Sequence, residues 1–370
     1  MAPLVDPDFW RDRDVLLTGH TGFKGAWLAL WLQALGARVT GLADTVPTEP
    51  SLYEIARVAG GMAADLRIDV RDHDAVRAAC VEAAPEIVVH MAAQALVRPS
   101  YADPHATFET NVMGTVNVLD AVRATPSVRA VVNVTSDKCY ANEPGREPRA
   151  FVEGDPMGGH DPYSSSKGCA ELVADAYRSS FFSGGPGAVR LGCARAGNVI
   201  GGGDWGEDRL IPDIVRGALA GTPIPVRNPE AVRPWQHVLN PLSGYLRLAE
   251  ALHGAAEDGG GWNFGPASGD ARTVRWIADR VSELWDGELA WEFDPGPHPP
   301  EAHFLTLDSA KARERLDWAA TWDLDATLHA IVAWYAALRA GADMREVTLA
   351  QIADFAATGT LCSPPQRARR

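Results

Sequence analysis

The chain carries little positive charge and very little lysine. Of its 370 residues, 34 are Lys or Arg and 48 are Asp or Glu, which gives a formal net charge of −14. Polyanionic surfaces repel such a protein, so we expect neither a nucleic acid nor a membrane as partner. Only four lysines stand against thirty arginines, at positions 24, 138, 167 and 311. Where arginine serves most positive positions, a retained lysine marks a place for a compact charge whose pKa can shift. Lys311 is expected to be an ordinary solvated helix residue.

Cysteine is also scarce, and long apolar runs are missing. The five cysteines include no C-x-x-C pair, which argues against a disulfide framework or a zinc ribbon and suits a reducing compartment. We therefore expect no metal. The first residues are acidic and mixed, unlike a cationic and apolar signal sequence. No segment reaches 18 uncharged apolar residues, so a membrane-spanning helix is not expected. These features together predict a cytoplasmic protein.

Short apolar runs alternate with helical patterns in the first half of the chain. Such alternation is typical of βαβ units, so we expect an α/β fold: a Rossmann-type, doubly wound parallel sheet with a smaller C-terminal substrate-binding lobe. Helices are predicted over 26–35 and about 164–182. The predicted strands are 14–18, 39–43, 68–70, 87–90, 130–135 and 187–194.

After about residue 195 the sequence becomes rich in glycine and proline. Helical patterns return only at about 241–254, 273–286 and 323–338. We therefore expect a first domain over 1–195, a second lobe mainly over 196–355 with some segments returning to the first domain, and a tail over 356–370.

A glycine-rich loop joins the first predicted strand to the first long helix. Gly19, Gly22 and Gly25 are spaced G-x-x-G-x-x-G, the version typical of short-chain dehydrogenases/reductases. Glycines let the backbone approach a pyrophosphate, while the helix N-terminus offers unpaired N–H groups. The alternative is a purely structural turn.

Charged residues near this loop bear on the choice between NAD and NADP. Asp44, at the end of the second predicted strand, is placed to bind a ribose 2′-hydroxyl and favours NAD. His20 and Lys24 add positive charge that would suit a phosphate, and a pyrophosphate partner for Lys24 reconciles the two. Asp69 and Val70, after the third strand, are placed to meet the adenine.

Two further motifs indicate proton-transfer chemistry. Tyr163 and Lys167 are four residues apart, so a helix puts both on one face, where Lys⁺ lowers the phenol pKa. Ser136, Asp137 and Lys138 end a predicted parallel strand, and ligands bind at that end of an open α/β sheet. The alternatives are a chance helical pair and a solvated loop with a helix cap. Three of the four lysines fall in these motifs and the glycine loop.

These motifs resemble those of the CDP-glucose 4,6-dehydratases, in the extended short-chain dehydrogenase/reductase group of nucleotide-sugar enzymes. The resemblance covers nearly the whole chain to about residue 355. Its discriminating piece is TSDK, because dehydratases of other nucleotide-glucoses typically have a Thr-Asp-Glu trio there. The matching stretches include TGHTGFKG (18–25), VVNVTSDKCY (131–140), DPMGGHDPYSSSKGCAEL (155–172), RAGNVIGGGDW (195–205) and RPWQHVL (233–239).

The resemblance implies an NAD-dependent dehydration of CDP-glucose to a 4-keto-6-deoxy sugar. Tyr163, with Lys167 and Ser136, would take the 4-hydroxyl proton; Asp137 would protonate the departing 6-hydroxyl, and Lys138 would assist the C5 proton transfer or modulate the cofactor. The implied cofactor-binding residues are Gly19, His20, Gly22, Phe23, Lys24, Gly25, Asp44, Asp69, Val70, Ala92, Ala93, Tyr163 and Lys167. The implied substrate-binding residues are Gln94, Arg98, Ser136, Asn198, Arg209, Leu210, Val226, Arg227 and Arg233.

Alternatives to this function remain open. A nucleotide-sugar 4-epimerase needs Ser, Tyr and Lys but no elimination chemistry, and a 4,6-dehydratase could use another nucleotide-hexose. A non-catalytic NAD-sensing protein is a third possibility. His160, Ser165 and Asn240 depart from the family pattern and are expected to line or adjoin the sugar pocket. The helices over about 104–123 and 164–182 resemble the pair that builds a homodimer interface.

Overall fold

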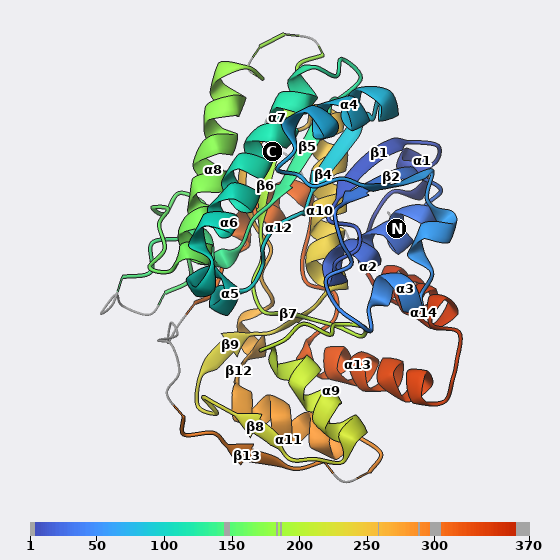
Figure 1. Ribbon diagram of the computed structural model, residues 1–370, viewed down its shortest axis with the longest axis vertical. Coiled ribbons are helices and arrows are strands. Elements are labelled where there is room, and N and C mark those ends of the chain that lie inside the picture. The colour runs from blue at the N-terminus through green and yellow to red at the C-terminus, as the bar shows by residue number, and fades with distance from the viewer. Residues whose placement is uncertain are drawn as a thin grey trace, which may run out of the picture.

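A central sheet of parallel strands organises the molecule (Figure 1). The computed structural model describes residues 4–143, 149–182, 184–185, 187–257, 259–287, 289–296 and 305–359. Within these ranges, seven parallel strands pair in the order β11-β6-β5-β4-β1-β2-β3. This order is that of a doubly wound Rossmann-type fold, which confirms the predicted class. The strands are β1 (Asp14–Thr18), β2 (Arg38–Ala43), β3 (Ala64–Arg67), β4 (Ile87–His90), β5 (Ala130–Val134), β6 (Arg190–Arg195) and β11 (Gly259–Asn263).

Both faces of the sheet are buried because successive strand residues point to opposite sides. In β1, Val15 and Leu17 belong to one core cluster, and Leu16 belongs to the other. The first cluster includes the helices α2 (Phe23–Ala34), α10 (Leu239–His253) and α14 (Met344–Thr358). The second includes α4 (His73–Ala83), α7 (Gly114–Arg123) and α8 (Pro162–Ser180).

A smaller lobe lies below the sheet in Figure 1. It begins after β6 with β7 (Val199–Ile200), which pairs in parallel with β10 (Gln236–His237). The chain then returns to the sheet, because α10 packs on β5 and β6, and β11 pairs with β6. The lobe's other elements are α9 (Leu210–Ala220), β8 (Ile224–Val226), β9 (Val232–Pro234), β12 (Ala271–Thr273), α11 (Val274–Leu284), β13 (Trp291–Phe293) and α13 (Leu324–Arg339).

Short elements complete the described chain. A π-helical turn, η2 (Glu109–Met113), joins α6 to α7, and α12 (Ala310–Leu316) packs against α10 and β11. The other short elements are α1 (Pro7–Trp10), α3 (Leu52–Ile55), α5 (Val97–Ala102), α6 (Pro104–Phe108), η1 (Val58–Gly61), η3 (Asp137–Cys139) and η4 (Ser268–Asp270). No helix among the described residues is both long and apolar enough to cross a bilayer.

Four predicted boundaries differ from the structure. The strand expected at 68–70 is wrong, because β3 ends at Arg67 and Asp69 lies in a turn whose carboxylate accepts the backbone N–H of Arg71 at 2.9 Å. The strand expected from 187 begins at Arg190. The helix expected from 26 begins at Phe23, and α14 extends to Thr358, beyond the predicted end of the second lobe. Residues 360–370 of the predicted tail lie outside the described residues.

Candidate active site

The glycine loop and the end of β4 are in direct contact. Gly19 has φ +74, and a Cβ there would lie 2.7 Å from the backbone N of Ala92. The Thr18 hydroxyl also accepts the N–H groups of Met91 at 3.0 Å and Ala92 at 3.1 Å. The predicted cofactor residues of the loop are thereby joined to Ala92 and the adjacent Ala93.

The local packing of the loop fits a dinucleotide pyrophosphate. A Cβ on Gly25 would lie 2.0 Å from the carbonyl oxygen of Gly19, so only glycine lets α2 begin this close to the loop. Gly22 is the N-cap of α2, and among the described residues no side chain caps this helix end. The first N–H groups of α2, from Phe23 onward, are therefore available to an anion.

His20 does not supply the exposed positive charge that the sequence suggested. Its side chain is fully buried, and Nε2 lies 2.8 Å from Oδ1 of Asp65. Burial lowers the pKa of His20, although Asp65 partly opposes the change. The imidazole therefore packs beneath the loop, and its neutral form puts no charge beside a ribose phosphate.

Lys24 points toward the sheet rather than outward from the loop. Its Nζ donates to the Tyr245 hydroxyl on α10 at 3.2 Å. Burial, together with the charges of Lys167 and Arg209, lowers the pKa of Lys24 to about 7. This orientation differs from the expected pyrophosphate contact, because it brings the ammonium toward α10 and within reach of the charges of Lys167 and Arg209.

The residues predicted to bind the adenosine half of the cofactor differ from one another in exposure and in hydrogen bonding. Asp44 is exposed directly after β2, as expected for an acceptor of ribose hydroxyls. The Asp69 carboxylate is already bound by Arg71, whose Nε lies 2.8 Å from Oδ2, and this contact lowers the pKa of Asp69. Val70 is buried against Gly114 of α7. Asp69 and Val70 therefore line the edge of the site from a turn rather than from a strand end.

Tyr163 and Lys167 both face the interior from the first turns of α8. Tyr163 is 8% exposed, and burial raises its pKa to about 12, while a hydrogen bond with Ser136 opposes the rise. The Lys167 ammonium donates to the Val134 carbonyl at 3.3 Å, at the end of β5. Burial lowers the pKa of Lys167 to about 8, and the Glu171 carboxylate works against that change.

Ser136 connects the phenol to the predicted acid. Its Oγ donates to Oδ1 of Asp137 at 3.0 Å and accepts the backbone N–H of Lys138 at 3.2 Å. Asp137 is 3% exposed, and burial raises its pKa. Lys138 is exposed. The structure thus joins Tyr163, Ser136 and Asp137 through hydrogen bonds and leaves the Lys138 side chain in solvent.

A buried ion pair behind these residues escaped the sequence analysis. Arg195 and Glu171 are bonded twice, through Nε–Oε1 and Nη2–Oε2, each at 2.8 Å. Glu171 also accepts from Thr135 at 2.5 Å, and Arg195 donates to the Tyr140 hydroxyl at 2.6 Å. The pair therefore anchors both ends of the segment that carries Ser136, Asp137 and Lys138. The sequence signal that pointed toward Glu171 was its i,i+4 spacing from Lys167 on the same helix.

Asn111 was also missed as a site residue. It lies in the π-helical turn η2, donates to Ser166 on α8 at 2.8 Å and accepts the backbone N–H of Gln94 at 2.8 Å. The Gln94 amide itself bonds Leu96 in the same loop and Thr107 on α6. Gln94 therefore shapes the loop after β4 rather than presenting a free amide to a substrate.

Two predicted substrate arginines share one carboxylate between the lobes. Arg98 on α5 bonds Oδ1 of Asp208 at 2.9 Å, and Arg227 of the second lobe bonds the same oxygen at 3.1 Å. Asp208 has φ +59, so it stands in a tight left-handed turn. The two guanidinium groups are thereby brought together across the lobes, although they are 110 and 19 residues from Asp208.

The remaining substrate candidates divide into pocket and core positions. Arg209, at the N-cap of α9, bonds both oxygens of the buried Asp204 at 3.1 Å. The positive charge of Arg233 acts on Asp137, which places the two side chains near one another. Asn198 has φ +48 in the connection between β6 and β7, and Leu210 is half-buried. Val226 is 2% exposed, so its side chain belongs to the core and is not available to a substrate.

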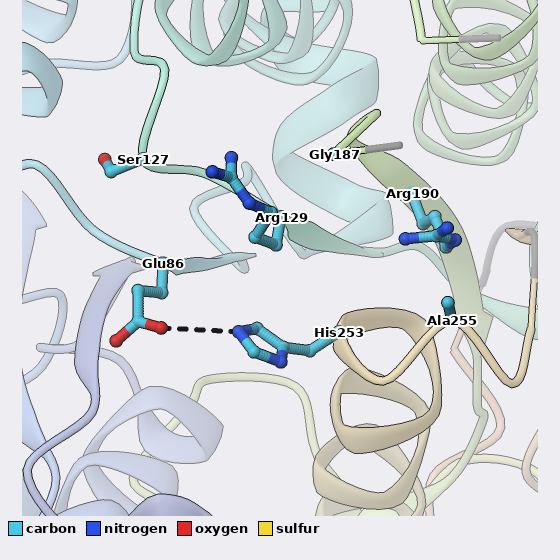
Figure 2. A pocket seen from close by; sticks show the side chains of 7 residues that line it. All are labelled: Glu86, Ser127, Arg129, Gly187, Arg190, His253 and Ala255. Atoms are coloured by element: carbon cyan, nitrogen blue, oxygen red, sulfur yellow. Dashed lines mark hydrogen bonds and ion pairs between the residues drawn. The ribbon is translucent and has the colours of Figure 1, made fainter. Parts of the chain in front are cut away.

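A separate hollow of ≈ 680 Å³ lies at the opposite edge of the sheet (Figure 2). Glu86 and Arg129 precede β4 and β5, Arg190 begins β6, and His253 ends α10. Figure 2 shows the Glu86 carboxylate directed at His253, whose Nε2 is 3.3 Å away. This hollow is at the amino ends of the strands, so it is distinct from the catalytic residues. The described residues contain no group of three or more His, Cys, Asp or Glu suited to a metal ion.

The sequence pattern of the NAD dependent epimerase/dehydratase family matches residues 15–265. The chain belongs to this family. A curated relative, the CDP-glucose 4,6-dehydratase of Salmonella typhimurium LT2, is 49% identical over 362 residues, which cover 96% of this chain and 100% of that protein. The dTDP-glucose 4,6-dehydratase of Xanthomonas campestris pv. campestris is 27% identical, covering 86% of this chain and 92% of its own length.

Solved members of the epimerase/dehydratase family share the fold. The UDP-glucose 4-epimerase of Stenotrophomonas maltophila, solved with NAD, superposes with a TM-score of 0.76 at 22% identity, covering 89% of this chain and 100% of that one. The dTDP-glucose 4,6-dehydratase of Bacillus anthracis in complex with NAD gives 0.73 at 21% identity, over 90% and 99%. Membership of this NAD-dependent family identifies NAD as the cofactor, in agreement with Asp44 and the uncapped start of α2.

The three residues that depart from the family pattern lie in different environments. Asn240 is fully buried, and its amide bonds Thr321 and Trp322, so it does not line the sugar pocket as expected. Ser165 donates to the Gly159 carbonyl at 2.7 Å, which ties the start of α8 to the preceding loop. His160 is exposed, 3.6 Å from Glu143. Residues 144–148, which precede His160 and Ser165 in the chain, are outside the described residues.

Proposed function

We propose that this protein converts CDP-glucose to CDP-4-dehydro-6-deoxyglucose. The observation that carries the proposal is the hydrogen-bonded series Tyr163–Ser136–Asp137, with Lys167 beneath it and Lys138 beside it. An epimerase needs a base at the 4-hydroxyl but no acid for a leaving group. The 49% identical relative, named as a CDP-glucose 4,6-dehydratase, supports the same reaction and nucleotide.

The cofactor and the first proton transfer act at C4 of the sugar. Gly19, Gly22, Gly25 and the start of α2 would hold NAD, which supplies a hydride acceptor at C4 and a hydride donor for C6. Tyr163 takes the proton of the 4-hydroxyl, because its hydrogen bond with Ser136 favours the phenolate against the effect of burial, and Lys167 lies one helical turn along α8. The resulting ketone acidifies the neighbouring C5–H, so oxidation must precede elimination.

The elimination needs an acid at the 6-hydroxyl and a base at C5. Asp137 is suited to the first role because burial raises its pKa and favours the protonated form. Lys138 assists the proton transfer at C5. Two protons leave the sugar, from O4 and from C5, and two are supplied, to the departing hydroxyl and to C5 when the hydride adds at C6, so the cycle requires no net change in cofactor or protons.

The second lobe would hold the nucleotide. Arg209 and Arg233 are placed to bind the diphosphate, since a guanidinium contacts two phosphate oxygens at once. Asn198 joins them from the turn before β7. The β8 strand and Arg227 lie where the base would pack, with Val226 contributing backbone only. Arg98 would approach the same diphosphate from α5.

The proposal is tested with purified protein and NAD against CDP-, dTDP-, GDP- and UDP-glucose. We expect only CDP-glucose to yield a 4-ketohexose, detected by its ultraviolet absorbance in alkali. Tyr163→Phe is the matched inactive control, because it removes only the hydroxyl that accepts the proton. A 4-epimer as product, or equal rates with all four substrates, would contradict the proposal.

We also propose that the protein is a cytoplasmic homodimer. Four apolar side chains are exposed on the two helical stretches expected to form a dimer interface: Phe108, Met113, Leu172 and Phe181, at 37%, 49%, 61% and 51%. Exposed apolar side chains gathered on adjoining helices are typical of an interface. The free thiols of Cys80, Cys139 and Cys193 are buried, which suits a reducing compartment.

A further inference from the structure

The Asp137 carboxylate lies directly against the backbone of Gly197. Gly197 follows β6 and leads into the second lobe, whereas Asp137 opens the η3 turn after β5. A Cβ on Gly197 would lie 1.8 Å from Oδ2 of Asp137, 2.2 Å from its Cγ and 2.6 Å from Oδ1. Real Cβ atoms essentially never approach other atoms within 3.0 Å, so any side chain at position 197 displaces this carboxylate.

The need for glycine here is a need for space and not for an unusual backbone. Gly197 does not have the positive φ that favours glycine at Gly19 and Gly203. An alanine could therefore adopt the same backbone conformation, and the three atoms nearest to its Cβ would all belong to the Asp137 carboxylate. The position thus reports on Asp137 specifically.

Both partners are held in place, so neither yields easily. The Gly197 carbonyl accepts from Nε2 of Gln236 at 3.3 Å, and the same amide donates to the Phe264 carbonyl at 2.9 Å. Gln236 is 1% exposed. On the other side, Ser136 donates to Oδ1 of Asp137. The carboxylate is therefore enclosed between a hydroxyl and a glycine whose backbone is fixed.

We propose that Gly197 is a positioning residue for the elimination step: its missing side chain leaves the space in which the Asp137 carboxylate sits. The proposal rests on the proposed function for the role of Asp137 as the acid. It goes further by assigning a steric requirement to a residue of another strand connection, one that never touches the reacting atoms. A side chain at 197 impairs loss of water more than it impairs oxidation at C4.

The test is a double-mutant cycle with the full-length holoenzyme. Gly197→Ala is made with Asp137 present and with Asp137→Ala, and three quantities are measured: dehydration rate, accumulation of reduced cofactor, and Tm. We expect Gly197→Ala alone to slow dehydration by about 100-fold, the lower range for loss of a general acid, while C4 oxidation changes by less than about tenfold. Tm falls in the Asp137 protein and is restored in the Asp137→Ala protein, where the clash is gone.

Gly154→Ala is the matched control. No atom lies within 4 Å of a Cβ at this position, so its rates and Tm should equal those of the wild type. Wild-type dehydration by Gly197→Ala, or equal loss of oxidation and elimination, would overturn the proposal. So would a fall in Tm that is the same with and without the Asp137 carboxylate. If the wild type makes no 4-keto sugar, the proposed function fails, and the Tm cycle alone still decides whether Gly197 and Asp137 are coupled.

Discussion

Each of the four lysines has a defined environment at the residue scale. Lys24 and Lys167 are turned inward around the catalytic residues, and Lys138 stands beside them in solvent. Lys311, expected to be solvated, instead donates to the Gly261 carbonyl at 2.7 Å and lies 4.0 Å above the Trp262 ring. That expectation was wrong because helical periodicity says nothing about a strand edge packed beside the helix.

The two buried lysines predict a pH dependence of stability. Their ordinary pKa of 10.5 falls to about 7 for Lys24 and about 8 for Lys167. Between these values and 10.5 the unfolded chain binds protons that the folded chain does not, so stability rises with pH in that window. The loss begins as the pH falls below 10.5 and is complete at about 8 for Lys167 and about 7 for Lys24, below which both groups are charged in the folded and the unfolded chain.

The variant Lys24→Met isolates part of this effect. We expect its free energy of unfolding, measured with urea, to change less steeply with pH between about 7 and about 10 than that of the wild type. Lys138→Met removes an exposed lysine and should keep the wild-type slope. An unchanged slope in Lys24→Met would show that its ammonium is solvated in the folded protein.

Lys138→Arg tests whether a positive charge alone suffices beside Asp137. We expect dehydration to slow by about 100-fold or more, because a guanidinium does not exchange protons near neutral pH. Steady-state rates with CDP-glucose measure the effect, and Lys311→Arg is the control far from the reaction. A rate within twofold of the wild type would show that Lys138 does not transfer a proton and contributes only its positive charge.

At the scale of elements, the sequence predicted what is periodic and local. The buried strands β1, β4 and β5 were found because each is a short, continuous apolar run. The edge strand β3 was misplaced because its residues, ADLR, alternate between half-buried and exposed and give no such run. Tyr163 and Lys167 were found because helix geometry alone puts them on one face.

Contacts between distant elements account for what the sequence could not predict. Glu171 and Arg195 lie on α8 and β6, and Asp208 collects arginines from two lobes. Single charged residues of this kind are indistinguishable from solvated ones until the fold pairs them. The space at Gly197 could not be predicted either, because no sequence pattern identifies the side chain that fills it.

Removing one partner of the buried Arg195–Glu171 ion pair between α8 and β6 is expected to destabilise the protein strongly. Glu171→Gln leaves the buried guanidinium of Arg195 without its charge partner, both side chains being 5–6% exposed. We expect a loss of about 3–5 kcal/mol in the free energy of unfolding. Urea titration measures it. The control is Glu230→Gln, which breaks an exposed pair with Arg275 and should cost less than about 1 kcal/mol.

At the scale of the whole molecule, the negative charge and the arginine-rich lobe interface are compatible. The net charge of −14 belongs mainly to the exterior, while Arg98, Arg209, Arg227 and Arg233 gather near the junction of the lobes. A cluster of guanidinium groups in an otherwise acidic protein favours a small dianionic ligand over a long polyanion.

The proposed dimer predicts a clear response to one charged substitution. Leu172→Glu places a carboxylate on the exposed face of α8, and we expect the protein to sediment as a monomer. Leu219→Glu is the control, because Leu219 is 45% exposed on α9, in the second lobe. Sedimentation velocity distinguishes the states. A Leu172→Glu protein that sediments like the wild type would place the interface elsewhere.

The position of β11 has a consequence for dividing the protein. Because this strand comes after only the first part of the second lobe in sequence and yet pairs with β6, a fragment that stops near residue 195 would keep every proposed catalytic group and still lack its seventh strand. It would also lose α10, which covers β5 and β6. The bared edge of β6 would offer unpaired backbone groups to other copies, and the fragment would aggregate. The two lobes are distinct in the fold, but neither proteolysis nor truncation of the chain would separate them into stable pieces.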